Sequence, residues 1–272
     1  MNRALIRLFR PRLALLNSVT AVGGYLLFPA ETSYVTLCGL FFGVLLLAAA
    51  ASALNQALEQ DLDSVMQRTM ARPLPRGDLT VRTVTVCGGV AALAGGALLA
   101  LYAGNLPMIL GAASLLWYLA VYTPLKRRSS AALAVGAICG ALTPLIGWCA
   151  AGGKLLDYRI MFLAGLLYLW QIPHFWLLQR RHADDYRRAG LPLVAMGNEG
   201  SGVSGLLRLW IVALATGTML LPAFTLVPPR ASFWYLTFPL SLIMLFLLQS
   251  EKTLFSYLNL FPLLVTLTLF LY

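Results

Sequence analysis

The sequence predicts an all-α integral membrane protein, with about nine transmembrane helices around a central cavity that opens to the cytoplasmic side. Three observations predict this class. The chain is 60% hydrophobic and only 11% charged, with a mean hydropathy of +0.79, which is more apolar than a soluble domain requires. Its apolar residues come in runs of about 18 to 25, the length of a helix that crosses a bilayer. Its basic residues gather on one side of these runs.

The expected spans follow one another with short connections. In chain order they cover residues 13–30, 34–58, 82–103, 106–124, 131–152, 158–178, 203–222, 232–249 and 254–272. A basic segment precedes the first span, but no small-x-small cleavage site follows it, so this helix is expected to be retained. No stretch is long and polar enough for a second domain. Residues 1–272 are therefore expected to form one polytopic membrane domain.

The distribution of charge predicts the orientation. With the N-terminus in the cytoplasm and the loops alternating, 17 of the 20 lysines and arginines fall on the inner side. Only Lys154, Arg159 and Arg230 fall outside. This asymmetry predicts a cytoplasmic N-terminus and an outer C-terminus. The net charge of +10 therefore orients helices at lipid headgroups and does not indicate a nucleic-acid partner.

The acidic residues also concentrate on the inner side, in or beside the two long inner loops 59–81 and 179–202. Acids contribute little to topology, so their position needs another cause. A polar active-site mouth on the cytoplasmic face is the simplest one. Eight of the ten acids share this side: Glu59, Asp61, Asp63, Asp78, Asp184, Asp185, Glu199 and Glu251.

Asn55, Glu59 and Asp63 recur every fourth residue at the end of an apolar segment, so they are expected on one helical face. Carboxylate and amide oxygens suit Mg²⁺, which is often held together with a substrate's phosphate oxygens. Arg68 and Arg72 follow at once and suit the phosphate itself. The pattern predicts a diphosphate held through magnesium. A solvated helix end with Glu–Arg pairs is the alternative, but polar residues as deep as Asn55 usually serve a site.

The run from Asn55 to Pro73 reads Asn-x-x-x-(Asp/Glu)-x-x-x-Asp-x-x-Met-x-Arg-Thr-x-x-Arg-Pro, and it resembles the signature of the UbiA-type intramembrane prenyltransferases. Members of that family bind an isoprenoid diphosphate through Mg²⁺ and pass the prenyl group to an aromatic or porphyrin acceptor. Glu59 stands where many members carry Asp, which keeps the charge but lengthens the arm. Tyr122-Thr-Pro-Leu-Lys126-Arg127 is similar to the family's Tyr-x-x-x-Lys element, whose lysine meets the diphosphate.

A third block narrows the resemblance to the subgroup that farnesylates protoheme. It reads Trp170-Gln-Ile-Pro-His-Phe175, followed after nine residues by Asp185-Tyr-x-x-Ala-Gly-x-Pro192. The likeness runs from about residue 10 to residue 200. One departure is Ala132, where the subgroup commonly has an asparagine.

The resemblance implies roles for particular side chains. Asp185 is expected to face Asp63 across the cavity, and His174 to contact the heme through its iron or a propionate. The implied metal ligands are Asn55, Glu59, Asp63 and Asp185, with Asp184 as a helper. The implied catalytic residues are Asp63, Asp185 and Lys126, and the implied substrate-binding residues are Asn55, Arg68, Arg72, Tyr122, Lys126, Arg127, His174 and Tyr186.

The implied reaction transfers a farnesyl group from farnesyl diphosphate to the vinyl group of heme b (protoheme IX), giving heme o and diphosphate for terminal oxidase assembly. The resemblance also implies a bacterial inner membrane and coupling to heme a synthase or oxidase assembly. A quinone precursor such as hydroxybenzoate remains an alternative acceptor. A transporter remains an alternative of another class, although most acids cluster at one face instead of tracing the bilayer.

Overall fold

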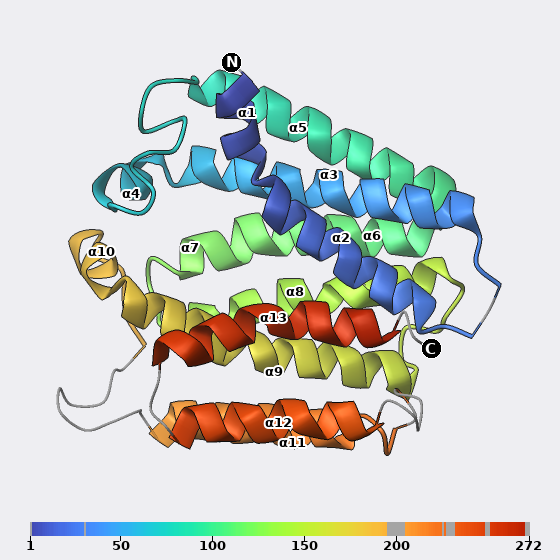
Figure 1. Ribbon diagram of the computed structural model, residues 1–272. Helices are drawn as coiled ribbons and strands as arrows, with labels where there is room; N and C mark the ends of the chain where they lie inside the picture. The colour runs from blue at the N-terminus through green and yellow to red at the C-terminus, as the bar shows by residue number, and fades with distance from the viewer. Residues whose placement is uncertain are drawn as a thin grey trace.

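The computed structural model describes residues 2–29, 31–194, 205–224, 226, 232–247 and 251–269. Within these residues every regular element is a helix, which confirms the all-α prediction (Figure 1). Glu199 and Arg230, assigned above to the inner and outer sides, lie outside the described residues.

The first part of the chain forms three long helices, α2, α3 and α5, with shorter segments between and beside them. In order these are α1 (Asn2–Phe9), α2 (Pro11–Leu26), α3 (Tyr34–Leu58), α4 (Gln60–Val65), α5 (Val81–Leu98) and the π-helix η1 (Leu99–Ala103). The remainder comprises α6 (Asn105–Leu116), the π-helix η2 (Trp117–Tyr122), α7 (Thr123–Leu125), α8 (Ala132–Ala150), α9 (Tyr158–Arg181), α10 (Ala183–Arg188), α11 (Gly205–Leu220), α12 (Ser232–Leu247) and α13 (Glu251–Leu269).

Each of the nine apolar segments expected to cross the membrane overlaps a helix. Five helical segments among the described residues are long and apolar enough to span a bilayer: Tyr34–Leu58, Val81–Ala103, Asn105–Leu125, Ala132–Ala150 and Tyr158–Arg181. The chain is therefore an integral membrane protein. The total of nine spans stays a prediction.

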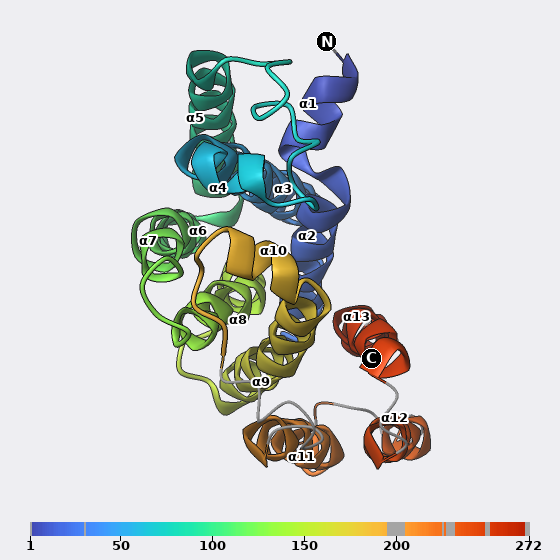
Figure 2. The same cartoon turned by 90° about the vertical axis from the view of Figure 1, so that its left-hand side faces the viewer.

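The helices run side by side around a cavity, and Figure 2 views this bundle from one end. Helices α2, α3, α6, α8, α9 and α13 stand around it, while α5 packs outside α3 and α11 packs outside α9. The crossing of α2 and α8 is close because of glycine. A side chain at Gly147 would overlap the carbonyl oxygen of Ala21, and one at Gly24 would overlap the backbone of Pro144.

The two long inner loops contain the short helices α4 and α10, which lie at the same end of the bundle (Figure 1). The polar segments that the sequence assigned to one side are thus together in space. The chain passes from α1 into α2 through Arg10, whose φ of 46° is the one left-handed value among the described non-glycine residues. Pro11 then begins α2.

Candidate active site

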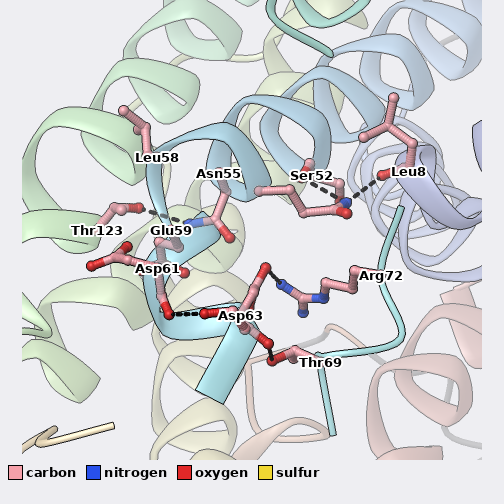
Figure 3. A network of polar contacts seen from close by, with 12 residues as sticks. Leu8, Ser52, Asn55, Leu58, Glu59, Asp61, Asp63, Thr69, Arg72 and Thr123 are labelled. Atoms are coloured by element: carbon pink, nitrogen blue, oxygen red, sulfur yellow. Dashed lines mark hydrogen bonds and ion pairs between the residues drawn. The ribbon is translucent and has the colours of Figure 1, made fainter. Parts of the chain in front are cut away.

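The three residues Asn55, Glu59 and Asp63, called the polar ladder below, follow a chain that bends at the middle one, Glu59. Helix α3 ends at Leu58, Glu59 has φ −119° and ψ 20°, and α4 begins at Gln60. Backbone hydrogen bonds from Glu59 N to Asn55 O (3.0 Å) and from Asp63 N to Glu59 O (2.8 Å) carry the four-residue spacing through the corner. The prediction that all three side chains share one helical face was therefore wrong, because Asp63 lies on a second helix. The three side chains are nevertheless buried beside one another (Figure 3).

These three residues line a cavity of about 1110 Å³ inside the bundle. Drug-sized ligands usually occupy pockets of about 300–1000 Å³, so this cavity has room for a large substrate or for two. Its wall also includes Arg68, Arg72 and Lys126 near the short inner helices. The cavity thus joins an apolar interior to a charged end.

Each ladder carboxylate is paired with a cation from elsewhere in the chain. Lys126 Nζ lies 2.6 Å from Glu59 Oε2, and Arg72 Nη1 lies 2.6 Å from Asp63 Oδ2. The Glu59 and Asp63 side chains are only 3% and 4% exposed. Removing one partner of such a buried pair costs about 3–5 kcal/mol, because the other charge is left buried alone. An incoming anion, in contrast, can take over the cation.

Thr123 orients the amide of Asn55. Asn55 Nδ2 donates to Thr123 Oγ1 (3.2 Å), and that hydroxyl donates to the carbonyl of Tyr118 (2.8 Å). The amide nitrogen is thereby engaged, which leaves the Asn55 carbonyl oxygen as the available ligand atom. Sequence reasoning missed Thr123. Its only local signal is its place directly after Tyr122 in the Tyr-x-x-x-Lys element.

Two tyrosines of the π-helix η2 face the cavity. Tyr118 and Tyr122 are stacked, with ring centroids 5.4 Å apart, and both line the cavity. Gly136 of α8 leaves room for the Tyr122 ring, since a Cβ there would lie 2.5 Å from it. Tyr122 was predicted and Tyr118 was not. π-Helical turns are rare and frequent at functional sites, but their position cannot be derived from an apolar sequence pattern.

Asp185 joins the two inner loops. Its carboxylate accepts hydrogen bonds from the backbone N–H groups of Gln67 (2.9 Å) and Arg68 (3.1 Å), and Arg188 donates to it at 2.6 Å. Burial alone raises the pKa of Asp185, but these two N–H groups and the Arg188 charge outweigh it and hold the pKa below its ordinary value. Asp185 is buried but does not line the cavity.

Two other predicted residues lie away from the cavity. The Asp184 side chain is 87% exposed and pairs with Arg187 at 3.1 Å. Arg127 pairs with Asp61 on the outside of the α3–α4 corner. Neither Asp184 nor Arg127 is in the cavity wall, so the structure does not bring them to the other site residues.

Aromatic rings form another part of the wall, around His174. The imidazole lies 5.1 Å from the Trp170 ring and 5.2 Å from the Phe255 ring, both in stacked orientation. Its buried Nδ1 has no hydrogen-bond partner among the described residues. Tyr186 also lines the cavity, with the Arg68 guanidinium 6.0 Å from its ring centroid.

Arg10 adds a cation that was not among the predicted site residues. It lines the cavity at the break between α1 and α2. Burial lowers the pKa of Arg10, and the nearby charge of Arg72 lowers it further. Left-handed backbone at a non-glycine residue is costly and tends to occur at functional sites. The only local indication of a helix break at Arg10 in the sequence is the proline that follows it, Pro11.

The donor set suits a magnesium ion in chemistry, although the described residues do not already form a metal cage. Among the described residues, no three or more His, Cys, Asp or Glu side chains lie close enough together to hold a metal ion. The oxygens of Asn55, Glu59 and Asp63 are hard ligands. Glu59 Oε1 is buried and has no hydrogen-bond partner among the described residues, so it is an acceptor without a donor. A cation at this oxygen would satisfy it.

Comparisons with known proteins show what the chain is similar to. The sequence pattern of the UbiA prenyltransferase family matches residues 17–257. The chain is 56% identical to a protoheme IX farnesyltransferase of Geobacter sulfurreducens over 272 residues, which is 100% of both chains. It is 40% identical to a protoheme IX farnesyltransferase of Oleidesulfovibrio alaskensis over 85% of this chain and 81% of that one.

Two solved structures share the fold. One is the apo structure of a UbiA homologue from Aeropyrum pernix, with a TM-score of 0.79 and 18% identity over 96% of this chain and 98% of the other. The other is a UbiA homologue from Archaeoglobus fulgidus bound to GPP and Mg²⁺, with a TM-score of 0.67 and 15% identity over 98% of each chain. At these identities the likeness supports the arrangement of the helices.

Proposed function

The chain belongs to the UbiA prenyltransferase family, and from this premise we propose that it transfers the farnesyl group of farnesyl diphosphate to a vinyl group of heme b. The products are heme o and diphosphate. The observation that carries the proposal is the buried wall of Asn55, Glu59 and Asp63 with Lys126 and Arg72 bound to its carboxylates. The choice of acceptor rests on the full-length likeness to a protoheme IX farnesyltransferase.

Mg²⁺ is the proposed metal, held by Asn55, Glu59 and Asp63. When bound, it would neutralise the diphosphate and make it a better leaving group. From the second inner loop we propose Asp185 as a further ligand, although its carboxylate lies outside the cavity wall described above. Its Oδ1 already accepts from Gln67 and Arg188, whereas its Oδ2 accepts only from Arg68 and keeps one lone pair free. We assign no metal contact to Asp184, because it is exposed and paired with Arg187.

The cations of the site receive the charge of the leaving diphosphate. Lys126 and Arg72 exchange Glu59 and Asp63 for phosphate oxygens, while Arg68 and Arg10 contribute further positive charge at the same end of the cavity. Preorganised cations that meet developing negative charge stabilise the transition state most where water is excluded.

The apolar part of the cavity holds the farnesyl chain and the porphyrin. The carbon–oxygen bond to diphosphate breaks and its electron pair leaves with the diphosphate. The stacked rings of Tyr118 and Tyr122 stabilise the allylic cation through their faces. A vinyl carbon of heme b forms the new carbon–carbon bond, and water then adds to the porphyrin side chain and releases a proton. No covalent intermediate with the protein is needed.

His174 and Tyr186 are the proposed contacts to the heme. His174 stands among aromatic rings with a free Nδ1, in a wall suited to a flat macrocycle. Tyr186 shares the cavity with Arg68, where a propionate can be received.

The cellular setting follows from the same function. We propose a single domain over residues 1–272 in a bacterial inner membrane, with the N-terminus in the cytoplasm and the C-terminus outside. Heme o is consumed by the enzymes that complete terminal oxidases, so coupling to heme a synthase or to oxidase assembly is part of the proposal.

Mass spectrometry of extracted hemes tests the proposal. Membranes that contain the intact protein should convert heme b and farnesyl diphosphate to farnesylated heme, whereas Asp63→Asn should lower the rate by at least about 10²-fold. Size-exclusion profiles in detergent verify that the variant is folded. Prenylation of hydroxybenzoate but not of heme would overturn the proposed acceptor, and full activity of Asp63→Asn would overturn the proposed site.

A further inference from the structure

Two consecutive residues after α7 reach back to the corner between α3 and α4. Lys126 contacts Glu59 inside the cavity. Arg127 points to the exposed side of the same corner, away from the cavity. There its Nη1 and Nη2 each lie 2.7 Å from an oxygen of Asp61. The same Nη2 also donates to the carbonyl oxygen of Leu58 at 3.1 Å. Three hydrogen bonds therefore join the end of α7 to this corner.

The hydrogen bond from Arg127 to the Leu58 carbonyl supplies a partner that the end of α3 otherwise lacks. Helix α3 ends at Leu58, and carbonyl groups in the last turn of a helix lack helical partners. Arg127 satisfies this carbonyl and holds Asp61 in a two-point geometry that only a planar guanidinium supplies. The contact thus stabilises the corner at which the ladder changes direction, and it ties Lys126 to that corner.

Arg127 and Asp61 do not take part in the cavity wall. Their side chains are 36% and 63% exposed, and both guanidinium nitrogens at the tip of Arg127 are engaged. Their position suits an action through Lys126 and not direct contact with substrate.

We propose that Arg127 and Asp61 form a clamp, together with the Leu58 carbonyl, that positions Lys126 for the leaving diphosphate. The inference rests on the proposed function, because Lys126 must release Glu59 and meet a phosphate oxygen. During that exchange the clamp keeps the backbone at residue 126 against the α3–α4 corner. Asp61 and Arg127 are positioning residues, and Lys126 is the residue that touches the substrate.

A positioning role and a merely structural one predict different results. Exposed ion pairs contribute little to stability, so loss of this pair should leave thermal unfolding nearly unchanged. A displacement of about 1 Å at a reacting group can lower turnover about 10²-fold. Turnover and stability should therefore separate in the variants.

The test compares Asp61→Asn, Arg127→Gln and the exchanged double variant Asp61→Arg with Arg127→Asp. Asp78→Asn is the matched control, since it removes another exposed pair, with Arg76 at 3.5 Å, from the same inner loop. Farnesyl transfer to heme, affinity for farnesyl diphosphate by calorimetry and thermal unfolding are measured in detergent. Each single variant should lose about 10- to 100-fold in kcat at wild-type unfolding temperature. The exchanged variant should recover at least about tenfold, and Asp78→Asn should match the wild type.

Wild-type kcat in both single variants would overturn the clamp, as would equal losses in both singles without any recovery in the exchanged variant. A fall in kcat that only follows a fall in unfolding temperature would also overturn it. Failure of the proposed function looks different, because the wild type itself would not farnesylate heme. In that case weaker binding of farnesyl diphosphate by the single variants would still support the clamp, and unchanged binding would contradict it.

Discussion

His174 is held by aromatic rings, and its buried Nδ1 has no hydrogen-bond partner among the described residues. It stacks between Trp170 and Phe255 and meets the edge of Phe175 at 5.2 Å, so its orientation is set by packing. A buried nitrogen without a hydrogen bond is costly, and such atoms are rare in folded proteins. The residue therefore combines a ring position that packing sets with a polar atom that has no partner among the described residues.

Replacing His174 by Phe should separate packing from heme contact. The ring keeps its stacking with Trp170 and Phe255 but loses both nitrogens, so thermal unfolding should change little. The KM for heme should rise by about tenfold, which corresponds to the loss of one good polar contact. The KM for farnesyl diphosphate, measured in the same assay, is the internal control. An unchanged KM for heme would remove His174 from the acceptor site.

At the scale of elements, the π-helix η2 and helix α8 together place the tyrosine pair. The wider turn of η2 carries Tyr118 and Tyr122 into a stacked arrangement, and Gly136 on α8 provides the space beside Tyr122. The same face of α8 contacts the side chain of Gln171 at Gly140, and Gln171 in turn donates to the carbonyl of Ala137. Small residues of α8 thus determine how closely η2 and α9 pack against α8.

Gly136→Ala should displace the Tyr122 ring. The added Cβ would lie 2.5 Å from the ring, so the ring has to move away from α8. We expect transfer of the farnesyl group to slow by about tenfold or more, since small displacements at a reacting centre are costly. Gly89→Ala on α5 is the matched control, because a Cβ there meets no atom within 4 Å. Equal rates in the two variants would show that the ring position does not matter.

For the whole molecule, the decisive contact joins the two inner loops, which are 117 and 118 residues apart along the chain at their hydrogen bonds. Asp185 on α10 holds the segment that carries Arg68, and Arg72 follows in the same segment. The arginines of the first loop are thus positioned by the second loop. Closure of the polar end depends on both halves of the bundle.

Asp185→Asn should loosen this closure. The asparagine amide offers one oxygen acceptor but presents an NH₂ group to the other N–H donor. Hydrogen exchange at Gln67 and Arg68, followed by mass spectrometry, should accelerate by about tenfold or more. Amides in α5 should exchange as in the wild type. Unchanged protection at Gln67 and Arg68 would contradict the role of Asp185 in holding the loop.

The same residue predicts a dependence of stability on pH. The pKa of Asp185 lies below its ordinary value of about 3.9, so its ionised form is favoured in the folded state. The stabilisation is present above the unfolded-state pKa and is lost as pH falls through the folded-state pKa. The difference in unfolding temperature between wild type and Asp185→Asn should therefore be constant near neutral pH. It should shrink as the pH falls below about 4. A difference that grows on acidification would contradict this sign.

The sequence by itself determined what depends on composition and short spacing. Apolar runs of bilayer length identified the helices from Tyr34 to Arg181, and the residue types at positions 55, 59 and 63 predicted which oxygen atoms would bind a metal ion. The spacing of Asn55, Glu59 and Asp63 also survived the corner, because backbone hydrogen bonds preserve it locally. It did not reveal the corner itself.

Only the tertiary structure decided which charges meet. Lys126 and Glu59 are 67 residues apart, and Arg127 and Asp61 are 66 apart, so their pairing depends on how α7 docks against the end of α3. The sequence pattern likewise did not indicate the left-handed backbone at Arg10, the π-helical turn that ends at Tyr122 or the exposure of Asp184. Local spacing states which groups are available. The directions in which helices end and cross determine where those groups point, and that information is distributed over the whole chain.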